Sequence, residues 1–333
     1  MITDARVLDP EFVPNDVVHR DAEINLLSSV LRPVTDGGSV DPAFIYGPSG
    51  TGKTCIAQYT LDKLRESVID LNTQYVNCWE YHSHFDTLYR VLEGVGKTLN
   101  IHRQSTPQTL LLERLHDYNG PPYVIILDEV DQLDDPGVLY ELYRTPNLSR
   151  ILIGNEHESF FSRLDERVAS RLRAATRIEF APYGHQELVS ILHDRVRWGL
   201  HPDIITRAQL EEIADAAAGD ARVAIGVLRA AARRANQESA DLILDGFIAD
   251  AIPEAKAEIT QKNIEKLTDD QQILYEIIVE AGDIAPGDLY QRYKACADDP
   301  KTKRMVRNYL TKLVHYNLVE AHGKDRGRTY QVA

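Results

Sequence analysis

The sequence is poor in cysteine and has no apolar run that could cross a membrane. Its three cysteines, Cys55, Cys78 and Cys296, lie far apart without paired spacing, so reduced and buried thiols are expected. No run approaches the roughly 18 apolar residues of a membrane helix. The first 30 residues carry acids and prolines in place of a basic and then apolar signal. These absences favour a cytoplasmic protein with no membrane partner.

A cluster of metal-binding side chains is also missing from the sequence pattern. The two histidines of His82-Ser83-His84 have no accompanying group of ligands, so we expect no metal there. What is present is a chain of 333 residues, of which 43% are hydrophobic. That length and composition predict two or three domains with ordinary cores.

The segment Gly47-Pro48-Ser49-Gly50-Thr51-Gly52-Lys53-Thr54 fits the phosphate-binding pattern G-x-x-x-x-G-K-[ST]. The apolar run 43–46 predicts a strand before it, and 55–65 predicts a helix after it. Backbone N–H groups of such a loop close around phosphate oxygens, and the new helix directs its positive end at them. We expect Lys53 to reach the β- and γ-phosphates and Thr54 to ligate Mg²⁺. The predicted nucleotide contacts are Gly50, Thr51, Gly52, Lys53, Thr54 and Cys55.

A second part of the site is predicted where a buried strand ends. Residues 123–127, Tyr-Val-Ile-Ile-Leu, form a continuous apolar run typical of a parallel strand buried on both faces. Asp128 and Glu129 follow it, at the end of the strand where open α/β sheets bind ligands. We expect Asp128 to hold Mg²⁺, and Glu129 to orient and deprotonate the attacking water.

Three further polar features follow along the chain. The run 150–154 predicts a third strand and ends in Asn155, which suits either a turn or a hydrogen bond to the water or the γ-phosphate. Arg167 and Arg171 share a helix face, which suits either surface ion pairs or a finger that reaches a neighbour's γ-phosphate. Arg222 opposes the dipole at the start of a long helix, which indicates a purpose other than helix stability.

In this order, the motifs resemble those of AAA+ ATPases, and more narrowly those of the archaeal replication initiators. That family is related to the eukaryotic origin recognition complex and the cell-division-cycle helicase loader. The resemblance covers nearly the whole chain. The segments that carry it are Phe12-Val13-Pro14, His19-Arg20-Asp21-Ala22-Glu23, Gly47 to Thr54, Asp128-Glu129-Val130-Asp131, Asn155, Arg167 with Arg171, Tyr183 with Glu187, Leu188 and Arg195, and Gly219-Asp220-Ala221-Arg222.

The resemblance implies roles for several of these residues. Asn155 fits the family's first sensor, Arg171 its arginine finger and Arg222 its second sensor. Tyr183 and Arg195 are similar to the lid segment that contacts the nucleotide. ATP or ADP with Mg²⁺ is the implied ligand, bound between an α/β domain and a lid. The implied catalytic residues are Glu129, Asp128, Asn155 and Arg171. The resemblance implies that ATP hydrolysis is slow and switch-like.

Charge is distributed unevenly along the chain. The formal net charge is −14, but residues 301–333 hold eight basic and two acidic residues, a net of +6. The other 300 residues therefore sum to −20. Such asymmetry is typical of a terminus that contacts nucleic acid on an acidic body. The acid excess, with only 11 lysines among 37 basic residues, also resembles proteins of salt-loving archaea.

The pattern predicts an α/β AAA+ core, a helical lid and a C-terminal winged helix. Residues 1–182 alternate apolar strands and helices, as in an α/β nucleotide-binding domain. Residues 183–251 are helical in pattern and fit a lid, with 220–237 as the clearest helix. A polar linker is expected at 252–266, followed by the winged-helix domain at 267–333.

Three helices and a hairpin are predicted in the last domain. The helices are 269–281, 286–297 and 302–316, and the strands are 318–321 and 328–332. The third helix has an apolar face and a basic face, which suits a major groove or an ordinary solvated surface. In the family that the chain resembles, this domain binds DNA. The predicted DNA contacts are Lys303, Arg304, Arg307, Asn308, Lys312, Lys324, Arg326 and Arg328.

The segment 77–99 resembles the family's initiator-specific insertion, a second DNA contact. Its three acids stand against two bases, which disfavours direct phosphate contact. Its aromatic residues suit either a protein core or wedges between bases.

These features predict an ATP-regulated replication initiator that binds double-stranded origin DNA, helps to recruit the replicative helicase and associates with the nucleoid. A homo-oligomer on DNA is a further expectation. An ATP-sensing transcriptional regulator with the same domains is the alternative. A DNA-binding module with a degenerate ATPase is disfavoured by the intact Lys53, Asp128, Glu129 and Arg222.

Overall fold

The computed structural model describes residues 1–38, 40–155, 157–323 and 327–333. These residues form two compact units, Met1–Ile252 and Pro253–Ala333. In the described part of the chain, no helix is both long enough and apolar enough to span a membrane. The three cysteines are reduced: Cys78 is buried and Cys55 is half-buried, but Cys296 is exposed, so the expectation of buried thiols is wrong for Cys296.

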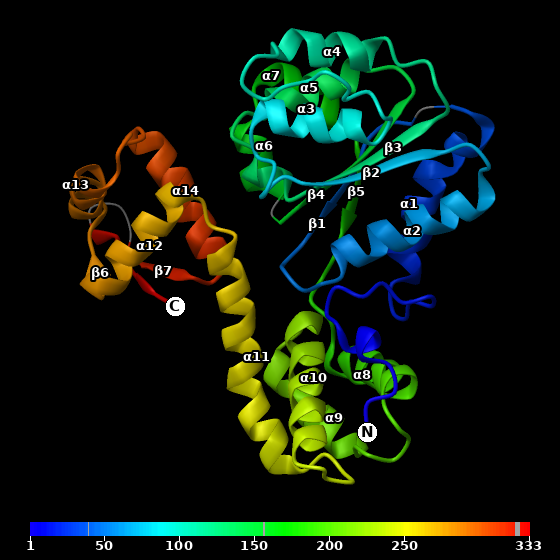
Figure 1. Ribbon diagram of the computed structural model, residues 1–333, viewed down its shortest axis with the longest axis vertical. Coiled ribbons are helices and arrows are strands. Elements are labelled where there is room, and N and C mark those ends of the chain that lie inside the picture. The colour runs from blue at the N-terminus through cyan, green and yellow to red at the C-terminus, as the bar shows by residue number, and fades with distance from the viewer. Residues whose placement is uncertain (39, 156, 324–326) are drawn as a thin grey trace. The chain divides into compact units, whose positions relative to one another are not determined.

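The first unit is built on a five-stranded parallel sheet of order β2-β3-β4-β1-β5 (Figure 1). The three strands predicted from apolar runs are present, because residues buried on both faces of a sheet must be apolar. The strands are β1 (Ala43–Tyr46), β2 (Asn72–Asn77), β3 (Tyr123–Asp128), β4 (Leu148–Gly154) and β5 (Thr176–Glu179).

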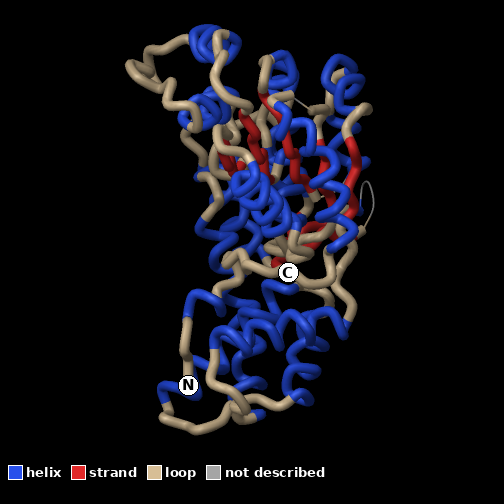
Figure 2. Tube along the Cα trace, turned by 90° about the vertical axis from the view of Figure 1, so that its right-hand side faces the viewer, coloured by secondary structure: helices blue, strands red, loops and turns tan. Residues whose placement is uncertain are grey.

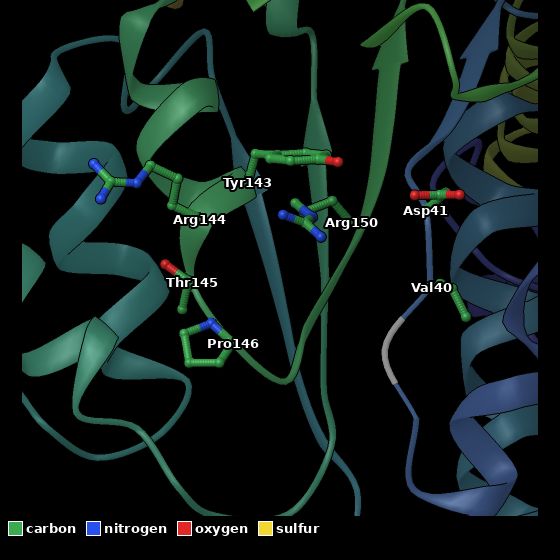
Figure 3. Close-up of a pocket in the computed structure, with 7 residues that line it drawn as sticks. All are labelled: Val40, Asp41, Tyr143, Arg144, Thr145, Pro146 and Arg150. Carbon is green, nitrogen blue, oxygen red and sulfur yellow. The ribbon is translucent and has the colours of Figure 1, made fainter. Parts of the chain in front are cut away.

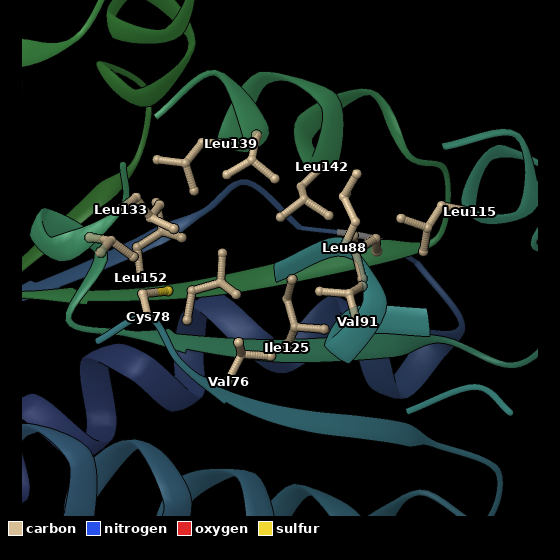
Figure 4. Close-up of a cluster of buried hydrophobic side chains, with 14 of the residues drawn as sticks. Val76, Cys78, Leu88, Val91, Leu115, Ile125, Leu133, Leu139, Leu142 and Leu152 are labelled. Atoms are coloured by element: carbon tan, nitrogen blue, oxygen red, sulfur yellow. The ribbon is translucent and has the colours of Figure 1, made fainter. Parts of the chain in front are cut away.

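The sheet separates two hydrophobic cores, since successive side chains of a strand point to opposite faces. On β3, Ile125 and Leu127 lie in one core, and Val124 and Ile126 lie in the other. The first core, drawn in Figure 4, is covered by α3 (His84–Glu93), α4 (Gln108–His116), α5 (Gly137–Arg144), α6 (His157–Arg163) and α7 (Glu166–Leu172). The second is covered by α1 (Asp21–Leu31), the 3₁₀ helix η2 (Arg32–Asp36) and α2 (Lys53–Ser67).

The rest of the first unit, residues 180–252, contains only helices and loops (Figure 2). Its helices are α8 (His185–Gly199), α9 (Arg207–Ala217), α10 (Ala221–Gln237) and the first part of α11 (Asp245–Glu265). The chain's first residues pack on these helices: the backbone N–H of Thr3 donates to the carbonyl of Gly199 at 2.9 Å. The 3₁₀ helix η1 (Ala5–Leu8) follows, and its Leu8 side chain is buried.

The segment predicted to be a polar linker, 252–266, is helical up to Glu265. Helix α11 runs without a break through Pro253, and the division between the two units falls inside it. Alanine, glutamate and lysine in this stretch have high helix propensity. A polar composition fits an exposed helix as well as a linker, so composition alone does not reveal that this segment is helical.

The second unit, which holds the rest of α11, combines helices with a three-stranded antiparallel sheet of order β6-β8-β7. Thr268 and Thr302 cap two of its helices, and Pro286 begins another. Strand β6 was absent from the sequence prediction. The elements are α12 (Asp269–Ala281), β6 (Asp283–Ile284), α13 (Pro286–Cys296), α14 (Lys303–His315), β7 (Val319–His322) and β8 (Thr329–Val332).

Two isoleucines test the importance of the second core. Ile126 is fully buried and Ile69 is fully exposed. We expect Ile126→Ala to lower the free energy of unfolding of the first unit by about 2–5 kcal/mol, because it leaves a cavity between sheet and helices. The matched Ile69→Ala change should stay within about 0.5 kcal/mol of the parent. Urea unfolding followed by circular dichroism measures both, and equal effects would contradict the assignment of this core.

Candidate functional site

Three adjacent strands bring two predicted catalytic residues and the start of the phosphate loop to one edge of the sheet. Asp128 ends β3, Asn155 follows β4, and Gly47 follows β1. Because the strands are parallel, their carboxyl ends share an edge, where such sheets bind ligands. The backbone N–H of Gly47 donates to the carbonyl of Asn155 at 3.2 Å, so the start of the phosphate loop is fixed to the end of β4.

The glycines of the phosphate loop lie in tight surroundings. Gly50 and Gly52 have φ angles of 75° and 89°, which favour glycine. A Cβ atom on Gly52 would lie 2.5 Å from the hydroxyl of Tyr183, and one on Gly47 would lie 2.1 Å from the carbonyl oxygen of Phe180. The loop therefore needs glycine at these positions, as a cradle for phosphate oxygens does.

Lys53 is buried inside this loop. Its ammonium Nζ donates to the carbonyl oxygens of Gly47 at 2.6 Å and Pro48 at 2.7 Å. Burial lowers the pKa of Lys53 to about 8, the negative charge of Asp128 opposes this shift, and Arg222 adds to it. The loop thus holds a cation whose charge is sensitive to pH near neutrality.

The hydroxyl of Thr54 and the carboxylate of Asp128 form a short hydrogen bond. Thr54 Oγ1 donates to Asp128 Oδ2 at 2.6 Å, and the hydroxyl of Tyr75 donates to the same oxygen at 3.0 Å. Burial raises the pKa of Asp128, while these two hydrogen bonds act in the opposite direction. A buried carboxylate beside a hydroxyl is a set of hard oxygen donors that fits Mg²⁺.

Tyr75 was not predicted as a site residue. It lies on β2, opposite Ile126 in the register of β2 with β3. The available signal was its position two residues before the end of a strand, and that signal is meaningful only when the neighbouring strand is known.

Glu129 stands directly after the buried strand in a strained backbone conformation. Its φ angle is 55°, and its backbone N–H donates to Asp128 Oδ1 at 2.9 Å. Positive φ at a residue other than glycine is uncommon and occurs preferentially at functional sites. The 3₁₀ helix η3 (Val130–Gln132) begins after it, and Asn155 Nδ2 lies 3.5 Å from Asp131 Oδ2.

The start of α10 contacts the phosphate loop directly. The backbone N–H of Ala221 donates to the carbonyl of Gly50 at 3.0 Å. Asp220 caps the helix, and its Oδ2 lies 3.1 Å from Nη2 of Arg222. The Nε atom of Arg222 is buried and has no hydrogen-bond acceptor among the described residues. A guanidinium with an unmatched donor beside the loop fits an anionic ligand.

Arg20 joins the phosphate loop to the segment that leads into the helices. Its Nη2 donates to the carbonyl oxygens of Thr51 at 3.1 Å and Ala181 at 2.7 Å. Its guanidinium lies 4.1 Å from the centre of the Tyr183 ring, while that tyrosine's hydroxyl faces Gly52. The family resemblance included the segment 19–23 but gave Arg20 no role. Its partners are backbone carbonyl oxygens far away in the chain, which a sequence pattern cannot reveal.

Arg195, a predicted nucleotide contact, lies beside the chain's first residues. Its guanidinium donates to the carbonyl oxygens of Val7 at 2.8 Å and Phe12 at 3.0 Å. It therefore anchors the chain's first residues, and its contact with nucleotide stays a prediction. Burial raises the pKa of the neighbouring Cys55 to about 11, and the positive charge of Arg195 opposes that shift.

Arg171, the predicted finger, packs on aromatic rings of α5. Its guanidinium lies 4.5 Å from the centre of the Tyr140 ring and 5.8 Å from that of Tyr143. Its Nη1 donates to the carbonyl of Arg167 at 2.9 Å. Neither use left open by the sequence is decided by these contacts.

The basic face of α14 is exposed at four of the predicted DNA-contact positions. Lys303, Arg304, Arg307 and Asn308 are exposed, and so is Arg328 before β8. Lys312 is 6% exposed, and its contact with DNA stays a prediction. Lys324 and Arg326 lie outside the described residues.

The aromatic residues of the segment 77–99 are buried or pack against the first core. Trp79 is 2% exposed, and Tyr81, Phe85 and Tyr89 pack against the cluster. These contacts favour the core alternative over base-stacking wedges.

A separate pocket of about 350 Å³ lies at the amino ends of β1 and β4. Figure 3 shows the Arg150 guanidinium beside the ring of Tyr143, with Asp41 across the pocket. The phosphate loop lies at the opposite, carboxyl edge of the sheet, so this pocket is distinct from the predicted nucleotide site.

Comparisons with known proteins agree with this arrangement. Residues 41–160 match the family described as an AAA domain, and residues 189–253 match the Cdc6 AAA+ ATPase-type lid domain. The fold and the phosphate loop therefore define an AAA+ ATPase with a Cdc6-type lid, a class of nucleotide-binding proteins.

Relatives of similar length identify the family. The chain is 56% identical over 308 residues to ORC1-type DNA replication protein 1 of Halobacterium salinarum, which covers 92% of this chain and 100% of the relative. It is 50% identical over 332 residues to ORC1-type DNA replication protein 9 of that organism, with coverages of 100% and 94%. The chain belongs to the family of ORC1-type DNA replication proteins.

Solved structures show the same fold. The ORC1 protein of Aeropyrum pernix in complex with DNA has a TM-score of 0.78 and 26% identity, over 100% of this chain and 93% of that one. The ORC2 protein of Aeropyrum pernix in ADPNP–ADP complexes has a TM-score of 0.68 and 22% identity, over 100% and 94%.

The lowered pKa of Lys53 makes nucleotide affinity depend on pH. With a pKa of about 8, Lys53 is mostly charged at pH 7 and mostly neutral at pH 9. We expect the affinity for ATP to fall by about tenfold over this range, because the neutral amine no longer attracts phosphate. Calorimetric titration at several pH values measures it. Any affinity retained by Lys53→Arg should be flat, since arginine does not titrate there; a flat profile for the parent would contradict the prediction.

Proposed function

We propose that this AAA+ ATPase is a replication initiator that binds ATP with Mg²⁺ at the phosphate loop. Slow hydrolysis of the ATP would switch the state of the initiator on DNA. The contact that best supports the proposal is the hydrogen bond from Ala221 to Gly50, which brings Arg222 beside the loop that contains Lys53. Two cations from different parts of the chain then lie near one phosphate cradle. Such a pair compensates charge that develops on a γ-phosphate.

The residues at the strand ends supply the remaining chemistry in this proposal. Thr54 and Asp128, 2.6 Å apart, would hold Mg²⁺. Bound there, Mg²⁺ neutralises charge on the phosphate oxygens. Glu129 accepts the proton of the attacking water, and Asn155 orients that water or the γ-phosphate. Tyr183 lies against Gly52 and contributes to the nucleotide pocket on the lid side.

Arg171 is proposed to act on the nucleotide of a neighbouring copy. Its contact with the Tyr140 ring leaves its guanidinium partly exposed near the surface. An arginine that pairs with a carboxylate in its own chain would have to break that ion pair before it could contact a phosphate. For Arg171, the contacts in the described part of the chain are two aromatic rings and a carbonyl oxygen, which a phosphate can replace more readily.

The second unit is proposed to be a winged-helix domain that binds double-stranded origin DNA. Helix α14 has a buried apolar face, which includes Val306 and Leu310, and an exposed basic face. Strands β7 and β8 form the hairpin of the wing. The related Aeropyrum pernix ORC1 protein was solved in complex with DNA. Side chains on such a helix read bases in the major groove, and the wing contacts phosphates.

Recruitment of the replicative helicase and assembly into a homo-oligomer complete the proposal. The relatives at 56% and 50% identity are DNA replication proteins, so the transcriptional alternative is not favoured. On DNA the protein would be associated with the nucleoid.

Two substitutions separate nucleotide binding from hydrolysis. Lys53→Ala should abolish detectable ATP binding, because the cation inside the loop is lost. Glu129→Gln should retain the parental affinity and remove turnover, since the amide cannot accept the proton of the water. Calorimetry and phosphate release measure the two properties. Unchanged affinity in the first variant, or unchanged turnover in the second, would exclude that residue from its proposed role.

A pair of arginines tests the DNA interface. Arg307 lies on the exposed face of α14, and Arg292 lies exposed on α13. Arg307→Ala should weaken binding to a preferred duplex by about 1–3 kcal/mol and relax sequence preference, if the arginine reaches a guanine edge. Arg292→Ala removes the same charge from another helix and should have little effect. Fluorescence anisotropy at several salt concentrations compares them, and equal losses would exclude α14 as the reading helix.

A further inference from the structure

The carboxylate of Asp220 lies against the phosphate loop. A Cβ atom added to Gly50 would lie 2.0 Å from Asp220 Oδ1, which shows how closely the carboxylate approaches that glycine. Asp220 Oδ1 also accepts hydrogen bonds from the backbone N–H groups of Arg222 at 2.8 Å and Val223 at 3.2 Å. A negative charge therefore lies beside a loop whose geometry suits anions.

The other oxygen of this carboxylate holds the arginine that the proposed site uses. Nη2 of Arg222 lies 3.1 Å from Asp220 Oδ2, and the side chains are 38% and 24% exposed. A partly exposed ion pair of this kind is weak. An anion of higher charge that enters the loop can therefore take the guanidinium from Asp220.

We propose that Asp220 weakens the binding of a nucleoside triphosphate at the loop by competing with its phosphates for Arg222. This inference rests on the proposed ATP site. The nucleotide must overcome repulsion from the carboxylate and must replace it as the partner of Arg222. A triphosphate, with more charge and a further phosphate to offer, does so more effectively than a diphosphate. Asp220 thus lowers the affinity for every nucleotide through repulsion, and it lowers the affinity most for the nucleotide that engages Arg222.

Capping of α10 is the other use of Asp220, and one substitution separates the two. Asparagine caps a helix about as well as aspartate but carries no charge. Asp220→Asn therefore keeps the start of α10 in place and removes both the repulsion and the ionic competitor.

The affinities of the full chain and of Asp220→Asn for ATP and ADP can be measured by calorimetry at low and high salt. We expect ATP to bind on the order of tenfold more tightly to the variant at low salt, with a smaller gain for ADP. The gain should shrink at high salt, because repulsion between partly exposed charges is screened. Unchanged or weaker ATP binding, or a gain that does not depend on salt, would overturn the proposal.

Asp250→Asn is the matched control. Asp250 pairs with Arg234 near the far end of α10, so this variant also removes a carboxylate that pairs with an arginine of the same helix. It should leave the affinity for ATP unchanged, and an equal gain would overturn the proposal by showing a general effect of net charge.

Two more variants complete the test. In the double variant Asp220→Asn with Arg222→Ala, most of the gain for ATP should disappear, and full retention would show that Arg222 is not involved. If thermal unfolding shows that the asparagine variant is damaged, Asp220→Ser also caps without charge and should give the same gain. A parent chain that does not bind ATP would refute the proposed function itself, whereas a parent that binds and a variant without gain refute only the role of Asp220.

Discussion

Burial of strand β3 on both faces is the constraint on which the rest of the first unit depends. Five of its six side chains alternate between the two cores, so the helices on both faces of the sheet pack on this one strand. A strand held this firmly delivers its last residue, Asp128, to a defined place at the sheet edge. The neighbouring parallel strands deliver the phosphate loop and Asn155 to that edge, and the register of the sheet therefore sets the geometry of the site.

The same burial sets the electrostatics of that edge. Burial lowers the pKa of Lys53 and raises that of Asp128, so the pKa of each group differs from its ordinary value. Each is held by hydrogen bonds from within the chain: Lys53 by loop carbonyls and Asp128 by two hydroxyls. Buried groups held in this way are positioned for a ligand before it arrives, which reduces the cost of binding it.

The lid contributes through polar contacts at the loop. The backbone hydrogen bond between Ala221 and Gly50 positions Asp220 and Arg222, which carry opposite charges, beside the same glycine. Arg20 makes a parallel connection through Thr51 and Ala181. Because these contacts are polar, an anionic ligand that exchanges partners with Arg222 would act directly on the connection between sheet and lid.

The sequence by itself determined the features that depend on local pattern. It predicted the phosphate loop with its flanking strand and helix, the buried strand that ends in Asp128, and the helices of the second unit, because composition, caps and periodicity are written in neighbouring residues. Only the tertiary structure decided the partners of Tyr75, Arg20 and Arg195, since their hydrogen bonds reach residues far away in the chain. It also decided that Lys312 is buried and that α11 is continuous, because burial and the packing of a polar helix depend on what lies beside them.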